Sequence, residues 1–239
     1  MSKPRRVALS CALGLTGSLL VAPLQAGAQD APPAWRDDFT SRVEVLALLQ
    51  SLNADLLSHP SATLTLERWC GAHHLAPEAK VVAERVQGVD KPLPEDARQQ
   101  LDIGPDEPVR YRRVQLACGG HVLSEADNWY VPSRLTDAMN HELDSSDTPF
   151  GKVVQPLHFR RQTLSADLLW SPLPQGWETG APVSPGTAAP LQIPHHVLQH
   201  RAVLYDQSNR PFSLVVESYT SDVLAFPQPA RDSPASSSP

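Results

Sequence analysis

The stretch that decides the fold is RYRRVQLACGGHVLSEADNWYV, at residues 110–131. On both sides of Gly119-Gly120, β-branched, aromatic and other apolar residues alternate with polar ones, as in two strands joined by a tight turn. We therefore predict an antiparallel pair over residues 109–117 and 122–131. Three arginines lie in the first strand, and buried charges are costly unless they are paired or hold a ligand. The pattern predicts a pocket for a small anionic molecule.

Helical and strand patterns surround this pair. Ser41 and Glu44 form a capping box, and the apolar residues that follow are spaced by three and four, which predicts a helix to about Ser58. A second short helix is expected over 61–69. Further strands are expected over 80–86, 157–170, 197–205 and 212–225, and further helices from 133 and from 149. This inventory predicts an α+β domain, an antiparallel sheet with helices packed mainly on one face.

The first 28 residues have the pattern of an export signal. Lys3, Arg5 and Arg6 precede an apolar run over 7–22, and Ala26-Gly27-Ala28 fits the small-residue cleavage rule. We expect cleavage near Ala28 and a periplasmic or secreted protein without stable membrane insertion, because the run is short for a membrane span. An uncleaved anchor and twin-arginine export are the alternatives.

The remaining chain is predicted to form one domain over 36–226. Residues 171–195 are rich in Pro, Gly, Ala and Ser and predict a flexible insertion, and residues 227–239 predict a disordered tail. Signal removal takes away three positive charges and no acid, so the net charge of -6 becomes -9. That balance argues against a nucleic-acid partner. The oligomeric state is not indicated.

Arg113 is the first candidate for the pocket. Alternation places Tyr111 and Arg113 on one face of the strand, and Arg112, Val114 and Leu116 on the other. One arginine of the adjacent pair must therefore point into the domain or its pocket. A surface strand whose arginines extend into solvent is the alternative. The planar guanidinium suits a carboxylate ligand because it binds one through two hydrogen bonds and stays charged.

Glu217 is the second candidate. It interrupts FSLVVESY at residues 212–219, the most apolar strand of the C-terminal half. A carboxylate there either occupies a dry site that tunes its protonation or forms a structural ion pair with Arg201 or Arg113.

Other polar residues carry weaker signals. Glu125, Asp127 and Asn128 predict a solvated face rather than a metal site, and no metal or other cofactor is expected. The histidines at 195, 196 and 200 adjoin the insertion and are expected at the surface. Cys70 and Cys118 favour a disulfide over a zinc site, because neither belongs to a CxxC pair.

The order of motifs resembles the chorismate lyase family. The motifs are R-x-V-x-L at 112–116, ADNWYVP at 126–132, TPFG at 148–151, a basic strand, and RPFSLVVE at 210–217. The resemblance covers about residues 46–225. It implies an antiparallel sheet with helical flaps over an internal pocket, and a cofactor-independent carbon–oxygen lyase that cleaves chorismate to 4-hydroxybenzoate and pyruvate. The export signal and the longer insertion depart from the family.

The resemblance also assigns roles by position. The substrate-binding arginine falls on Arg113 and the catalytic acid on Glu217, while Phe150 supplies a main-chain contact to the substrate. The basic residue after the TPFG motif matches Arg160 or Arg161. The alternative function is non-catalytic binding of a small aromatic or enolpyruvyl carboxylate in the periplasm.

The strand pairing that the resemblance implies bears on the cysteines. If residues 80–86 pair with 109–117, the residues just before the first strand lie near those just after the second. Cys70 and Cys118 are among them, and we predict that they form a disulfide.

Overall fold

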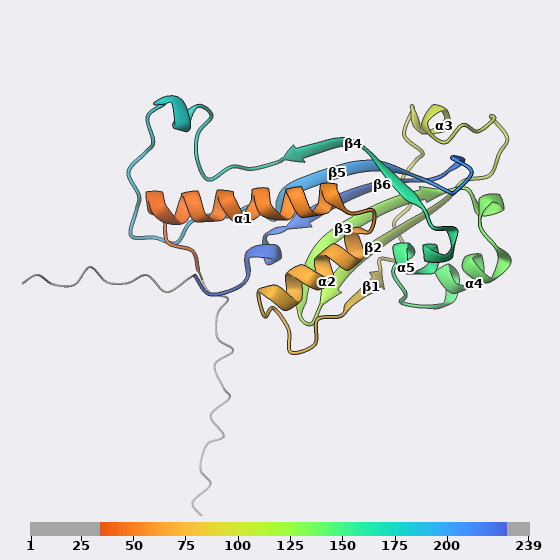
Figure 1. Ribbon diagram of the computed structural model, residues 1–239, viewed down its shortest axis with the longest axis horizontal. Helices are drawn as coiled ribbons and strands as arrows, with labels where there is room; N and C mark the ends of the chain where they lie inside the picture. Colours follow the sequence, from red (N-terminus) through yellow and green to blue (C-terminus); the bar gives the residue numbers. More distant parts are fainter. Residues whose placement is uncertain (1–33, 229–239) are drawn as a thin grey trace, which may run out of the picture. The chain divides into compact units, whose positions relative to one another are not determined.

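A computed structural model describes residues 34–228, which form a six-stranded antiparallel sheet with helices (Figure 1). The predicted α+β class is confirmed. The strands run in the order β1-β2-β3-β6-β5-β4. The expected export signal and nearly all of the tail lie outside the described residues. The elements are α1 (Phe39–Ser58), α2 (Ala62–Ala72), β1 (Val81–Arg85), α3 (Ala97–Gln100), β2 (Arg110–Cys118), β3 (His121–Tyr130), η1 (Pro132–Arg134), α4 (Asp137–Ser145), α5 (Phe150–Val153), η2 (Gln155–Leu157), β4 (Arg160–Leu168), η3 (Trp177–Thr179), β5 (His196–Tyr205), β6 (Pro211–Thr220) and η4 (Ser221–Leu224).

Several element boundaries differ from the sequence expectation for local reasons. The first helix begins at Phe39 because Asp38, rather than Ser41, is its N-cap and accepts a hydrogen bond from the Ser41 amide at 2.8 Å. The helix expected from 133 begins at Asp137, capped by Thr136. The long C-terminal strand stops at Thr220, where a 3₁₀ turn begins. The short helix α3 lies in a connection for which no helix was predicted.

The register of the sheet decides which side chains share a face. Arg112 pairs with Asn128, and Arg113 with Asp127. Ala126 pairs with Glu217 across β3 and β6, and Glu217 pairs with His200 across β6 and β5. Directly paired residues point to the same side of an antiparallel sheet. One face therefore carries Arg112, Glu217 and His200, and the other carries Arg113.

Helices α1 and α2 cover the face that carries Glu217 (Figure 1). Leu49, Leu52 and Leu66 are fully buried there. Two tryptophans join this helical layer to η4. The indole N–H groups of Trp35 and Trp69 donate to the backbone carbonyls of Leu224 and Val223 at 2.9 and 2.8 Å. Among residues 34–228, no helix is both long and apolar enough to cross a membrane.

The opposite face is covered at one end by the segment that contains α3. Ala97 and Leu101 pack there with Trp129, Val203 and Leu214 of the sheet. Asp96 accepts hydrogen bonds from both terminal nitrogens of Arg201, at 2.6 and 2.8 Å.

Residues 171–195 include the short 3₁₀ turn η3 and make defined contacts with residues 35–37, which precede α1. The Thr187 amide donates to the Asp37 carbonyl at 2.9 Å, and the Leu191 amide donates to the Trp35 carbonyl at 2.8 Å. Gly186 is required by this contact, since a Cβ atom there would lie 2.0 Å from the Asp37 carbonyl oxygen. The insertion is therefore attached to the domain rather than free of it.

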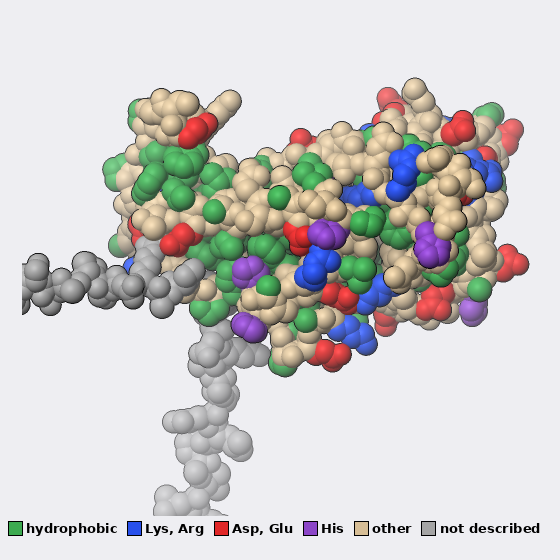
Figure 2. Space-filling model, in the orientation of Figure 1, with side chains coloured by type: hydrophobic (Ala, Val, Ile, Leu, Met, Phe, Trp, Pro, Cys, Tyr) green, Lys and Arg blue, Asp and Glu red, His purple; other side chains and the backbone are tan. Residues whose placement is uncertain are grey.

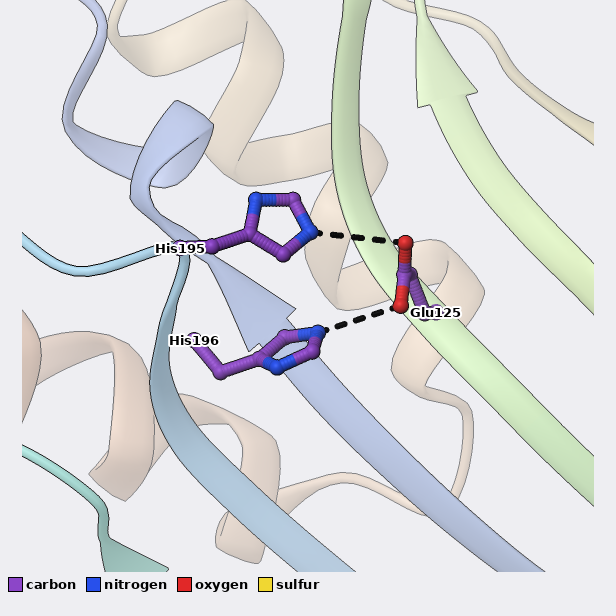
Figure 3. A group of neighbouring side chains, drawn as sticks. All are labelled: Glu125, His195 and His196. Carbon is purple, nitrogen blue, oxygen red and sulfur yellow. Dashed lines mark hydrogen bonds and ion pairs between the residues drawn. The ribbon is translucent and has the colours of Figure 1, made fainter.

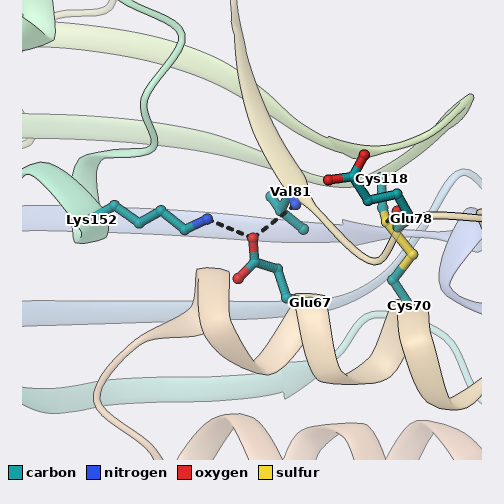
Figure 4. Close-up of a disulfide and its surroundings, with 6 residues drawn as sticks. All are labelled: Glu67, Cys70, Glu78, Val81, Cys118 and Lys152. Atoms are coloured by element: carbon teal, nitrogen blue, oxygen red, sulfur yellow. Dashed lines mark hydrogen bonds and ion pairs between the residues drawn. A yellow bond between two sulfur atoms is a disulfide. The ribbon is translucent and has the colours of Figure 1, made fainter.

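A disulfide joins Cys70 of α2 to Cys118 at the end of β2, with a Cα–Cα distance of 6.6 Å (Figure 4). Both cysteines are fully buried. The bond fastens the C-terminal end of α2 to the sheet.

Removing the disulfide should lower the free energy of unfolding by about 4 kcal/mol, because it closes a chain segment with a sequence separation of 48. Denaturant unfolding of the Cys70→Ala/Cys118→Ala variant measures this loss. A reductant should destabilise the wild type and leave the variant unchanged. Equal stability of the oxidised wild type and the variant would contradict the assignment.

Candidate functional site

A cavity lies between the helix-covered face of the sheet, the start of α2 and helix α5. Its volume is about 50 Å³, which is room for a few water molecules. Residues 60–63 and α5, here called the flaps, close one side of it. An added Cβ at Gly151 would lie 3.5 Å from the Ser61 hydroxyl, so the flaps are in near contact. The polar and aromatic side chains in the cavity wall include Arg112, Asn128, Phe150, Phe159, Arg161 and Glu217.

Glu217 forms a buried ion pair with Arg161 in this cavity. Arg161 Nη2 donates to Glu217 Oε2 at 2.6 Å, and the side chains are 6% and 8% exposed. Burial opposes the charge on Arg161, but the Glu217 carboxylate outweighs it and raises the pKa of the guanidinium. One oxygen of the Glu217 carboxyl group therefore accepts a hydrogen bond from Arg161 and is engaged in a pair within the protein.

Two further buried polar side chains, Tyr219 and His200, lie beside the ion pair. Tyr219 donates its hydroxyl to Glu217 Oε2 at 3.3 Å, and its burial beside that carboxylate raises the tyrosine pKa well above its ordinary value. His200, expected at the surface, is fully buried on the neighbouring strand. Its Nε2 lies 2.8 Å from Oδ1 of the Asn53 side chain, an acceptor, so Nε2 carries the proton. Burial lowers the pKa of His200 to about 4, and the ring is neutral at pH 7.

Arg112 has no comparable partner. Its side chain is 5% exposed, its Nε has no hydrogen-bond partner, and its one side-chain bond runs from Nη2 to the Thr148 carbonyl at 3.4 Å. Within the described residues, no carboxylate lies within ion-pair distance of it. Burial first, and repulsion from Arg85 second, lower the pKa of Arg112 to about 10, so it remains charged at pH 7. A buried cation thus lines the cavity without an anion.

Arg113 does not line the cavity, so its selection as the pocket arginine was wrong. It lies on the opposite face of the sheet, where Nη2 donates to Glu125 at 3.0 Å and Nη1 to Asp127 at 3.1 Å. The two predicted catalytic residues, Arg113 and Glu217, are on different faces and do not share a site. The signal that identifies Arg112 was present in the sequence, because it shares its face with Val114 and Leu116.

Of the other predicted site residues, Phe150 and Arg161 line the cavity and Arg160 does not. Phe150 lines the cavity, and its ring packs 5.5 Å from that of Tyr130. Arg161 faces the cavity, which resolves the choice between the two basic residues. Arg160 points away, donates to the Asn209 side chain at 2.9 Å and stacks on the Tyr205 ring.

Charges of both signs mix on the face of the molecule seen in Figure 2, where Lys and Arg are interspersed with Asp and Glu. This face of the described residues therefore shows no continuous basic surface of the kind that nucleic acids require. The absence of a nucleic-acid partner stays a prediction.

The fold and the cavity define an α+β protein with a charged internal site. No protein-family model matches the chain. It is 54% identical over 210 residues to a Sinorhizobium fredii (strain NBRC 101917 / NGR234) protein described as "Uncharacterized protein y4mC", an alignment that covers 87% of this chain and 89% of that protein. The chain belongs to the same family as y4mC.

Solved structures give more distant similarities. PhnF from Mycobacterium smegmatis matches 73% of this chain and 70% of its own, at 15% identity and a TM-score of 0.45. The effector domain of PhnF matches 68% and 90%, at 15% identity and a TM-score of 0.43. YydK from Bacillus subtilis, described as a possible transcriptional regulator, has 17% identity and a TM-score of 0.36, and the chain spans 62% of its length. At these scores, no activity or ligand transfers to this chain.

The identification with the chorismate lyase family is corrected by these findings. None of the proteins reported above is described as a lyase: y4mC is described as uncharacterized and YydK as a possible transcriptional regulator. The geometry agrees with the correction, because Arg113 is absent from the cavity and Glu217 is paired with Arg161. The exported lyase function is withdrawn.

Buried His200 should make stability depend on pH. Its pKa is about 4 in the folded protein and about 6.5 in the unfolded chain. Between these values only the unfolded chain takes up the proton, so stability falls as the pH drops from 6.5 to 4, by at most about 3 kcal/mol.

The test compares the free energies of unfolding of the wild type and His200→Gln at pH 7 and pH 4. The glutamine amide can still donate to Asn53, and it does not titrate. The variant should lose less stability on acidification than the wild type. Parallel loss in the two proteins would show that His200 does not contribute.

Proposed function

We propose that the chain binds a small molecule that has an anionic group and a flat apolar part, such as an aromatic carboxylate, in the cavity beneath the flaps. The observation that carries the proposal is Arg112, a buried cation in the cavity wall without a carboxylate partner. Arg161 already has its partner in Glu217. These three side chains together leave one positive charge that a ligand anion would neutralise.

The energetics of Arg112 favour a ligand over a purely structural role. An ion that is removed from water costs several kcal/mol unless an opposite charge and hydrogen bonds offset that cost. The single bond to the Thr148 carbonyl is long for a hydrogen bond, at 3.4 Å. A ligand carboxylate could accept from the guanidinium through both oxygens.

The rest of the cavity wall suits the same ligand. Helix α2 begins at the cavity, and its first backbone N–H groups and dipole favour an anion. The rings of Phe150 and Phe159 supply apolar surface for a flat group.

A ligand of this size requires more room than about 50 Å³, so the flaps must separate to admit it. The Lys152–Glu67 ion pair, at 2.5 Å, links the flap helix α5 to α2 (Figure 4). Both side chains are partly exposed, and such a pair contributes only about 0–1 kcal/mol.

The predicted export is proposed as well. A buried disulfide is typical of proteins that fold in an oxidising compartment, which agrees with the signal expected from the sequence. The intact mass of the protein recovered from its native cells tests this. A chain that starts near Gln29 and has no free thiols would support export, and a full-length chain with two free thiols at 70 and 118 would oppose it.

Benzoate, other aromatic carboxylates and their matched carboxamides serve as probes for the cavity. At least one carboxylate should raise the melting temperature of the wild type, while its uncharged carboxamide does not. Arg112→Met should weaken the binding of that carboxylate by roughly 10- to 100-fold, because it removes hydrogen bonds to a charged group. Isothermal titration calorimetry measures the affinities.

Arg113→Gln is the matched control, because it removes the neighbouring guanidinium on the other face of the sheet and should leave affinity unchanged. The free energy of unfolding of Arg112→Met distinguishes a ligand-binding role of Arg112 from a structural one. Without ligand, Arg112→Met should keep or raise the free energy of unfolding, because it replaces an unpaired buried charge by an apolar chain. The proposal fails if no carboxylate binds, or if Arg112→Met binds as the wild type does.

A further inference from the structure

A second cluster of side chains lies on the face of the sheet that carries Arg113. Glu125 extends from β3, His196 is the first residue of β5, and His195 precedes it at the end of the irregular insertion. Figure 3 shows both imidazole rings directed at the Glu125 carboxylate. His195 Nε2 lies 3.4 Å from Oε1, and His196 Nε2 lies 3.1 Å from Oε2. The three residues are here called the Glu125–His195–His196 cluster.

These distances match the spacing of ligands around a metal ion. Zinc lies about 2.0–2.2 Å from imidazole nitrogen and carboxylate oxygen, in tetrahedral geometry, so its ligand atoms are about 3.3 Å apart. The ligand atoms of the cluster all lie within 4.8 Å of one another. The separation of 3.4 Å is beyond the usual range of an N–H···O hydrogen bond. Small side-chain adjustments would bring the three donors around one ion.

Neighbouring residues hold the Glu125 carboxylate in place. Arg113 Nη2 donates to Oε2 at 3.0 Å, and Gln115 Nε2 donates to Oε1 at 3.3 Å. Each carboxylate oxygen has two acceptor positions, so each can accept from β2 and still coordinate an ion. Hydrogen bonds of this kind orient metal-binding carboxylates in known sites.

The backbone of the cluster is also fixed. The Ser221 amide donates to the His195 carbonyl at 2.8 Å, which anchors the end of the insertion. Exposure of the side chains is graded, with Glu125 at 13%, His196 at 38% and His195 at 62%. An ion could therefore enter from solvent and keep water at its remaining positions.

We propose that the Glu125–His195–His196 cluster binds a divalent transition-metal ion of the zinc class. Two imidazoles and one carboxylate are the protein ligands, and water completes the coordination. The ion links β3 to the start of β5, two strands that are separated by β6 in the sheet. It thereby fixes the end of the insertion, at a site on the other face of the sheet from the cavity.

The proposal is tested with the full chain, without a polyhistidine tag and after treatment with a chelator. Titration with Zn²⁺, followed by calorimetry, should give one site per chain, and Zn²⁺ should raise the melting temperature. The variants His196→Ala and Glu125→Gln should each weaken binding by about 10-fold or more. Their melting temperatures without metal establish that they remain folded.

The control variant His59→Ala/His141→Ala removes two exposed histidines that lie outside the cluster. It should bind Zn²⁺ as the wild type does. Loss of binding in this control would overturn the proposal, as would a wild type that binds no Zn²⁺. If Glu125→Gln leaves the affinity unchanged, the adjacent histidines act as a simple surface chelate and the three-ligand site is wrong.

Discussion

The alternation of side chains along β2 is the constraint on which both candidate sites depend. Because successive residues of a strand point to opposite faces, Arg112 and Arg113 are directed to opposite sides of the sheet. Arg112 enters the cavity beneath the helices, and Arg113 orients Glu125 on the other face. A shift of one residue in the β2–β3 register would exchange the two guanidinium groups and dismantle both arrangements.

The buried charged groups on the helix-covered face differ in whether they have a partner within the protein. Arg161 and Tyr219 both donate to Glu217, and His200, whose ring packs against Tyr219, is hydrogen-bonded to the Asn53 side chain of α1. Removal of Arg161 or Glu217 would leave the other as an uncompensated buried charge. Arg112 has no such carboxylate partner, and this difference distinguishes it, as a group available to a ligand, from the paired Arg161.

The sequence predicted the fold well, because periodicity reports burial directly. The spacing of Leu49, Leu52 and Leu56 identified α1, and Gly119-Gly120 located the turn between β2 and β3. The site was only partly predictable. Glu217 and Arg161 are charged residues within otherwise apolar or alternating strands, so the sequence identifies them. The choice of Arg113 relied on a family resemblance instead of on the apolar residues that share the face of Arg112. His195 and His196 lie seventy residues from Glu125 in the chain, and only the register of the sheet brings them together.

The disulfide has a mechanical consequence for α2. The C-terminal end of this helix is joined covalently to β2 through Cys70, and the indole of Trp69 is hydrogen-bonded to the Val223 carbonyl. The N-terminal end at Ala62, about 12 Å from Cys70 along the helix axis, forms part of the cavity wall. Helix α2 is thus fixed at one end. If the helix rotates slightly about the disulfide, its free end, at the cavity, moves farthest.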